Sequence, residues 1–152
     1  MAKMGLSVKD DPRKIVDIAG REWGDPVDGL ALSVMLRPKE DPDELPAISV
    51  AIQNRGTLIL RLPTLGWLHF FQVSLNDSRG AAVELTPYGR ERMKPERMQA
   101  LSEIVLEPGE ATEADIPLGS IYQMGRGQYR VQASCETPSG VRASSNTLTL
   151  TF

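Results

Sequence analysis

The sequence contains few of the residues on which most catalytic and disulfide-bonded proteins depend. Its 152 residues include one cysteine, Cys135, one histidine, His69, and only 5% aromatic residues. A single cysteine cannot form an intramolecular disulfide bond, and a single histidine cannot supply the clusters typical of zinc sites. So few aromatic side chains also argue against a base-stacking surface or an aromatic strip for sugars.

The sequence also lacks a basic excess and a long apolar run. The formal net charge is −3, from 17 basic and 20 acidic residues, which gives no electrostatic footprint for nucleic acid. Because about 18 consecutive apolar residues are needed to span a bilayer, we expect no transmembrane helix. The first residues carry no apolar segment of a signal peptide. As the sequence stands it predicts a cytoplasmic protein, or an exported one if a signal peptide was removed before Met1, so the compartment is left open.

Short alternating segments dominate the rest of the chain. Apolar and polar residues alternate with a period of two, which is typical of strands with one buried face, and Gly, Pro, Asn and Asp separate the segments. Seven or eight such strands without long helices predict an antiparallel immunoglobulin-like β-sandwich. The expected strands lie within residues 30–36, 48–53, 57–62, 67–75, 81–85, 112–116, 127–133 and 144–152, and residues 104–106 lead into a turn at Pro108-Gly109. The expected core residues are Val34, Ile48, Val50, Ile52, Phe71, Val73, Tyr129, Val131, Leu148 and Leu150.

We expect one sandwich domain over residues 26–152, preceded by a leader over residues 1–25. The leader is predicted to be weakly structured or to hold a short helix, because residues 11–19 allow one or two helical turns after Pro12. Further helical turns are expected around residues 96–101 and 120–124.

Several local motifs resemble those of a known family. They are an N-x-G turn in "AIQNRG", the hairpin of "FQVSLNDSRGAAVELTPYGR", the segment "LEPGE", and the closing strands "GQYRVQA" and "SNTLTLTF". Together they resemble bacterial immunoglobulin-like domains of unassigned function and, distantly, the intracellular proteinase inhibitors of bacilli. In that family Tyr129 would form a tyrosine corner, where the phenol bonds to the backbone. The resemblance implies a fold and transfers no catalytic residue.

Residues with chemical potential are isolated from one another. His69 has no nucleophile or acid motif around it, and no G-x-S-x-G occurs. Cys135 ends an alternating strand and is expected to be a small buried apolar residue. The acidic segment 40–44 offers oxygen ligands but lacks the spacing of an EF-hand, and the glycines of residues 125–127 lead into a strand instead of a helix, so they do not form a phosphate loop. The sequence therefore predicts no catalytic residue, metal or cofactor.

The best candidate for partner binding is a basic segment in the longest stretch without strands. Methionines interleaved with cations can form an adaptable binding surface, although the same pattern also suits a loop packed against a sheet. Trp67 is either a core residue or an exposed aromatic for protein recognition. The candidate binding residues are Arg90, Arg92, Met93, Lys94, Arg97, Met98 and Trp67.

These observations favour a non-enzymatic module that binds another protein through loops of a β-sandwich. The alternative is a protease inhibitor that inserts an exposed loop, within residues 90–97 or 63–67, into the protease cleft. The oligomeric state is left open.

Overall fold

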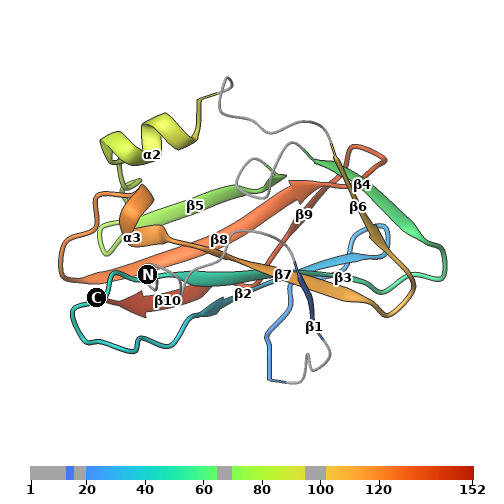
Figure 1. Ribbon diagram of the computed structural model, residues 1–152, viewed down its shortest axis with the longest axis horizontal. Helices are drawn as coiled ribbons and strands as arrows, with labels where there is room; N and C mark the ends of the chain where they lie inside the picture. Colours follow the sequence, from blue (N-terminus) through green and yellow to red (C-terminus); the bar gives the residue numbers. More distant parts are fainter. Residues whose placement is uncertain (1–12, 16–19, 65–69, 95–101) are drawn as a thin grey trace, which may run out of the picture.

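The computed structural model describes residues 13–15, 20–64, 70–94 and 102–152, in which two antiparallel sheets pack face to face (Figure 1). The first sheet has the order β1 (Arg13–Ile15), β7 (Ala111–Ile116), β3 (Ile48–Asn54) and β2 (Leu30–Leu36). The second has the order β10 (Leu148–Thr151), β8 (Gln128–Glu136) and β5 (Gln72–Asp77), and β9 (Arg142–Ser144) also pairs with β8. None of the described helices is long and apolar enough to cross a membrane.

The order in which the chain visits the sheets defines the topology. β2 and β3 belong to the first sheet, β5 to the second, β7 again to the first, and β8 to β10 to the second. This matches the A-B-E and C-F-G sheets of the immunoglobulin fold. The protein is therefore an immunoglobulin-like β-sandwich, as the alternating pattern predicts.

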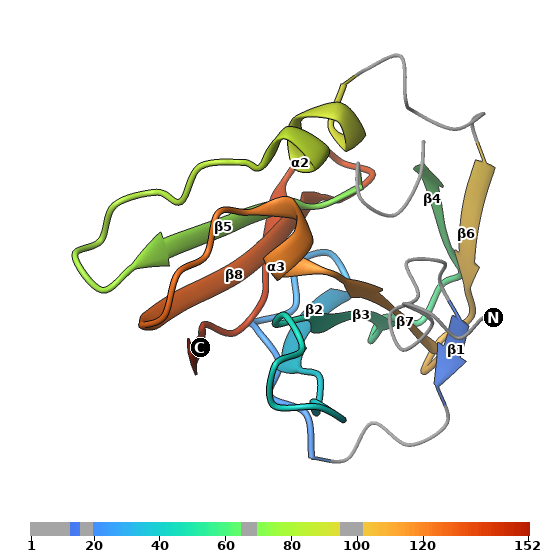
Figure 2. The ribbon, with the colours of Figure 1, turned by 60° about the vertical axis from the view of Figure 1, so that its left-hand side comes forward.

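One pair of strands lies outside the two sheets. β4 (Leu60–Thr64) pairs antiparallel with β6 (Ser102–Leu106), and Figure 2 shows this ribbon beside the sandwich. By its place in the chain β6 corresponds to strand D, which in an immunoglobulin constant-type domain joins the first sheet. Leu62 and Leu106 turn inward and are 1% exposed, whereas Arg61 and Val105 on the alternate positions are exposed. The ribbon thus contributes to the core with one face and leaves the other to solvent.

The core forms where the alternating faces of the two sheets meet. Cross-strand partners such as Val34 and Val50 in the first sheet, and Leu75 and Val131 in the second, bury aliphatic side chains. Each fully buried side chain of this kind stabilises the fold by roughly 1.5–3 kcal/mol. The ten predicted core residues are confirmed, because eight are buried in the cluster while Val73 and Leu148 pack against it partly buried.

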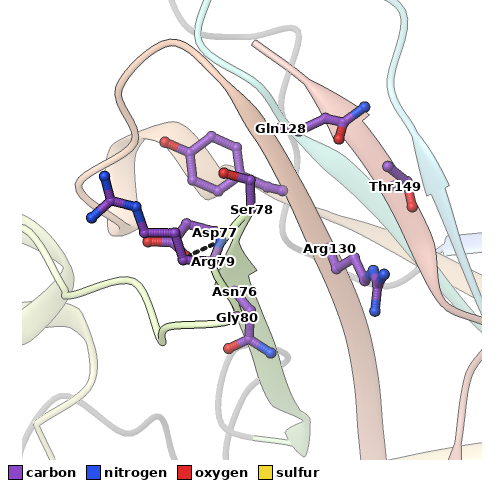
Figure 3. Close-up of a pocket in the computed structure, with 9 residues that line it drawn as sticks. Asn76, Asp77, Ser78, Arg79, Gly80, Gln128, Arg130 and Thr149 are labelled. Atoms are coloured by element: carbon purple, nitrogen blue, oxygen red, sulfur yellow. Dashed lines mark hydrogen bonds between the residues drawn. The ribbon is translucent and has the colours of Figure 1, made fainter.

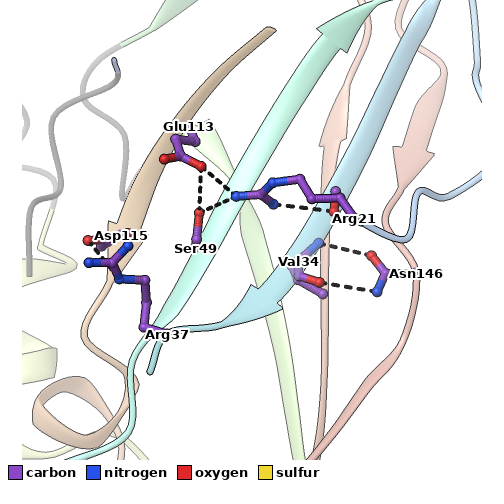
Figure 4. A network of polar contacts seen from close by, with 8 residues as sticks. Arg21, Val34, Arg37, Ser49, Glu113, Asp115 and Asn146 are labelled. Atoms are coloured by element: carbon purple, nitrogen blue, oxygen red, sulfur yellow. Dashed lines mark hydrogen bonds and ion pairs between the residues drawn. The ribbon is translucent and has the colours of Figure 1, made fainter. Parts of the chain in front are cut away.

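The outer face of the first sheet is also largely buried, and a polar network covers part of it (Figure 4). The guanidinium of Arg21 donates to the hydroxyls of Ser33 and Ser49, at 3.3 and 2.5 Å, and forms an ion pair of 2.6 Å with Glu113. Only 4% of the Arg21 side chain is exposed. These contacts join the segment before β2 to three strands.

The two sheets are joined at their edges by Asn146. Its Oδ1 accepts from the backbone N–H of Val34 at 2.9 Å, and its Nδ2 donates to the carbonyl of the same residue at 3.1 Å (Figure 4). Ser145 allows the break between β9 and β10, because its hydroxyl takes the N–H of Ala133 at 2.9 Å. Side chains therefore satisfy backbone groups that a continuous strand would otherwise pair.

The leader differs from its expected conformation. Arg13–Ile15 form the strand β1, paired with Glu113, Thr112 and Ala111 of β7, where the sequence favours a helical turn or loose chain. The edge of β7 supplies hydrogen-bond partners that local propensity does not reveal. Residues 1–12 and 16–19 lie outside the described residues, so the domain boundary at residue 26 stays a prediction.

Three other expected elements are corrected by the structure. Residues 81–85 form no strand: the chain runs back beside β5, where the N–H of Val83 donates to the carbonyl of Leu75 at 3.0 Å, but it makes only isolated bridges, from Ala82 to Asn76 and from Leu85 to Tyr122. β4 begins at Leu60 instead of residue 57, since the preceding residues belong to a loop. A helical turn expected at residues 120–124 is found at α3 (Leu118–Ile121), whereas the turn expected at residues 96–101 lies outside the described residues.

The tyrosine corner is confirmed in its geometry. The hydroxyl of Tyr129 donates to the carbonyl of Gly125 at 2.7 Å, and the ring is 7% exposed. This bond ties the start of β8 to the loop that enters it, as in other immunoglobulin-like sandwiches.

Candidate functional site

The predicted basic segment is partly a helix. α2 (Pro87–Arg92) begins at Thr86, whose hydroxyl accepts from the N–H of Gly89 at 2.9 Å. The helix lies directly on α3, because a Cβ atom at Gly89 would fall 2.1 Å from the carbonyl oxygen of Ile121. The Thr-Pro pair at residues 86–87 is a helix-start signal in the sequence. It predicts a helix at this position, whereas the expected helical turn was placed at residues 96–101.

The described cations of this segment have partners close by. Arg90 donates to the carbonyl of Leu85 at 2.9 Å, the Arg92 guanidinium lies 5.9 Å from the ring centre of Tyr88, and Lys94 pairs with Glu91 at 3.2 Å. Met93 is partly buried and packs against the core. These contacts favour the packing interpretation for the described half of the segment.

The structure does not show whether the remaining predicted binding residues belong to the same site. Arg97, Met98 and Trp67 lie outside the described residues, as does His69. The role of the basic segment in partner binding therefore stays a prediction.

A polar pocket of about 360 Å³ lies between the turn after β5 and strands β8 and β10 (Figure 3). Asp77 caps the turn, since its Oδ1 accepts from the N–H groups of Arg79 and Ala81 at 2.9 and 3.0 Å. In Figure 3 the guanidinium groups of Arg79 and Arg130 point in opposite directions. The pocket therefore offers no pair of cations that converge on one ligand.

A second groove, of about 420 Å³, lies at the end of the sandwich where β3 leads into β4 and β8 into β9 (right-hand end in Figure 1). It combines backbone-rich turns with exposed aliphatic side chains. We call it the loop-end groove, and it is lined by Asp28, Gly29, Asn54, Gly56, Thr57, Leu58, Ile59, Leu60, Arg61 and Pro138.

Asn54 holds the wall of the loop-end groove from beneath. This residue is fully buried, and its Nδ2 donates to the carbonyl oxygens of Leu58 at 2.8 Å and Leu106 at 2.9 Å. Its Oδ1 accepts from the N–H of Gly56 at 2.9 Å. One amide side chain thereby fixes the loop after β3 to the end of β6.

The opposite wall is joined to the turn between β8 and β9. Asp28 has a φ of 53°, and its Oδ2 accepts from the hydroxyls of Thr137, at 3.1 Å, and Ser139. The next residue, Gly29, has a φ of +83°, and a Cβ there would lie 3.2 Å from the Cα of Gly56. Glycine is required at this point because the two loops approach each other closely in a left-handed conformation.

Two neighbouring aliphatic side chains project from this framework. Leu58 is 78% exposed and Ile59 is 51% exposed, and Leu58 has the highest exposure of the large apolar residues described. Single exposed apolar residues are common, but these two are adjacent, line a groove and sit on a loop with fixed ends. The sequence predicts a strand that includes both, although the three successive apolar residues Leu58 to Leu60 break the alternation and indicate that at least one of them faces outward.

The isolated reactive residues adopt structural roles. Cys135 is 2% exposed, and burial raises the pKa of its thiol to about 12, with Arg142 acting weakly in the opposite direction. This confirms the prediction of a buried apolar residue. In the acidic loop, Glu44 and Asp41 accept backbone N–H groups of Glu40 and Asp43 at 2.8 and 2.9 Å. In the part of the chain that the structure describes, no three His, Cys, Asp or Glu residues are grouped to hold a metal ion.

Comparison with known proteins adds no function to this description. The sequence matches no protein-family model and no curated protein. Among solved structures, the GAE domain of GGA2p from Saccharomyces cerevisiae is similar with 10% sequence identity and a TM-score of 0.33, over 88% of this chain and 96% of that one. The assignment of the fold therefore rests on the strand order and the core described above.

Proposed function

We propose that this protein is a non-enzymatic protein-binding module and that the loop-end groove is its binding surface. The observation that carries the proposal is the exposure of Leu58 and Ile59, 78% and 51%, beside each other in a groove of about 420 Å³. The proposal agrees with the sequence-based expectation of a loop-presenting sandwich, but it moves the site from the basic segment to the opposite end of the sandwich.

The rigidity of the groove supports a binding role. The buried amide of Asn54 and the hydroxyl contacts of Asp28 hold both walls before any partner arrives. A preformed surface loses less conformational entropy on association than a mobile loop does. Burying one exposed leucine in a partner contributes roughly 1.5–3 kcal/mol, which corresponds to about 10- to 100-fold in Kd.

The experiment is affinity capture from cells of the source organism, followed by titration of each captured protein. Leu58→Ser with Ile59→Ser is expected to weaken binding by about 10-fold or more without lowering the melting temperature, because both side chains are exposed. Leu45→Ser is the matched control, since Leu45 is 48% exposed in the loop between β2 and β3, at the other end of the sandwich. Equal affinity of the groove variant and the control would contradict the proposed site.

Protease inhibition is the alternative proposal. Within the predicted inhibitory loop of residues 90–97, Arg90 and Arg92 belong to α2, and a helical segment does not present the extended chain that a strand-like ligand of a cleft requires. Stoichiometric inhibition of a serine protease or metalloprotease in a panel would favour this alternative, and loss of the inhibition in Leu58→Ser or in Arg90→Ser would locate the loop.

A further inference from the structure

The charges around the loop-end groove indicate what kind of segment it binds. Among the described residues, Asp28 and Arg61 are the charged side chains that line the groove itself. The adjoining strands and turns carry three further carboxylates, on Glu103, Glu107 and Glu110, and one further guanidinium group, on Arg55. Glu136 and Arg142, beyond the groove on β8 and β9, pair with each other at 3.9 Å. The surroundings of the exposed leucine and isoleucine are therefore net acidic.

The two cations are occupied within the protein. Arg55 donates to Gln53 at 2.8 Å and its guanidinium lies 5.0 Å from the ring centre of Trp23. Arg61 pairs with Glu103 at 3.2 Å. Neither is thus a free anchor for an acidic ligand.

Asp28, by contrast, can accept further hydrogen bonds through its carboxylate. Its Oδ2 takes the hydroxyls of Thr137 and Ser139, whereas its Oδ1 has no hydrogen bond to any described residue. The residue is exposed and lines the groove together with Leu58 and Pro138. A carboxylate held in place beside an apolar surface suits a Lys or Arg side chain, whose methylene stem covers apolar atoms while its head pairs with the acid.

The strand that supplies Leu60 and Arg61 favours an extended ligand. Among the described strands, β4 pairs only with β6, and an extended ligand added to its other edge would form main-chain hydrogen bonds with it. In an extended chain, side chains two residues apart share a face about 7 Å apart. A ligand of this kind can place an apolar and a basic side chain on the groove together.

We propose that the loop-end groove binds an extended segment of a partner protein carrying a bulky aliphatic residue two positions from a Lys or Arg. The aliphatic side chain packs against Leu58 and Ile59, and the cation pairs with Asp28. This inference rests on the proposed function and specifies the chemistry of the partner.

The test is selection of a displayed library of random 12-residue peptides on the immobilised full chain, followed by titration of synthetic versions of the enriched peptides. The expected consensus is Leu, Ile or Val with Lys or Arg two positions away. Leu58→Ser is expected to raise the Kd about 10-fold or more, Asp28→Asn about threefold to fivefold, and Leu45→Ser not at all. Asn tolerates the left-handed backbone at residue 28, so Asp28→Asn removes the charge without forcing a new conformation.

The other outcomes separate the two proposals. Binding that depends on Leu58 but selects peptides without a basic residue, or is unchanged by Asp28→Asn, overturns the inference and leaves the proposed function standing. Failure to enrich any peptide, or binding that is insensitive to Leu58→Ser, contradicts both. Self-association of the chain alone in sedimentation velocity, abolished by Leu58→Ser, would assign the groove to a second copy and also overturn the inference.

Discussion

The side-chain amide of Asn54 donates a hydrogen bond of 2.9 Å to the carbonyl oxygen of Leu106, and so joins the end of β3 to the ribbon that has left the sheets. The same nitrogen donates to the carbonyl of Leu58. Asn54 and Leu106 are both buried, so water cannot readily replace the amide as the partner of the Leu106 carbonyl. The shape of the loop-end groove therefore depends on one buried polar residue.

Asn54→Ala is expected to lower the free energy of unfolding by at least about 2 kcal/mol, because it leaves the buried carbonyl oxygen of Leu106 without its donor and also removes the bonds to Leu58 and Gly56. Chemical denaturation measures the change. Asn76→Ala is the control, since Asn76 is half-buried at the end of β5 and its substitution should cost less than about 0.5 kcal/mol. A similar loss for both variants would mean that the amide of Asn54 does not act as a clamp.

Asn146→Ala is expected to expose the backbone of Val34, whose N–H and carbonyl both bond to the Asn146 side chain. Hydrogen exchange measured by NMR should show faster exchange of the Val34 amide than in the wild-type chain. The amide of Val50, within β3 between two neighbouring strands, provides the internal reference. Unchanged protection of Val34 would show that another group covers this edge of β2.

Arg21→Met is expected to destabilise the protein by about 3–5 kcal/mol, because it leaves the carboxylate of Glu113 largely buried without its cation. Adding Glu113→Gln should recover part of the loss. Lys94→Met gives the comparison for an exposed pair, with an expected cost of no more than about 1 kcal/mol. If Arg21→Met cost no more than Lys94→Met, the network over the first sheet would be dispensable.

Cys135 is expected to resist alkylation by iodoacetamide at pH 8 in the folded protein and to react once the chain unfolds. Burial raises its pKa from 9.0 to about 12, so the folded state holds the thiol proton more tightly than the unfolded state. The corresponding stability is present below pH 9 and is lost as the pH rises from 9 to 12. Labelling is measured by mass spectrometry, and rapid labelling of the native protein would contradict the buried position of the thiol.

The alternating pattern was sufficient to predict the sandwich and its core, because each central strand buries one side of a period-two repeat. Val34 and Val131 illustrate this, since both lie inside as the pattern requires. The pattern could not reveal β1, because the pairing of Arg13 with Glu113 depends on a residue 100 positions away along the chain. Long-range pairing of this kind leaves no local signal.

The candidate site was harder to predict than the fold. The sequence favours the cations within residues 90–97 as a binding site, because charged residues that are close together along the chain can be recognised without knowing the fold. Leu58 and Asp28 come together only when β3 and the start of β2 are folded side by side. Conversely, the contacts of Arg90 and Lys94 with their own segment appear only in three dimensions.

The most direct test of the binding site is an NMR chemical-shift map of the full chain, with the strongest captured or selected partner segment added. The largest shifts are expected on residues 28–29, 56–61 and 137–139, and they should disappear in Leu58→Ser. Largest shifts on residues 86–94, with the groove unaffected, would contradict the proposed site and return the binding role to the basic segment.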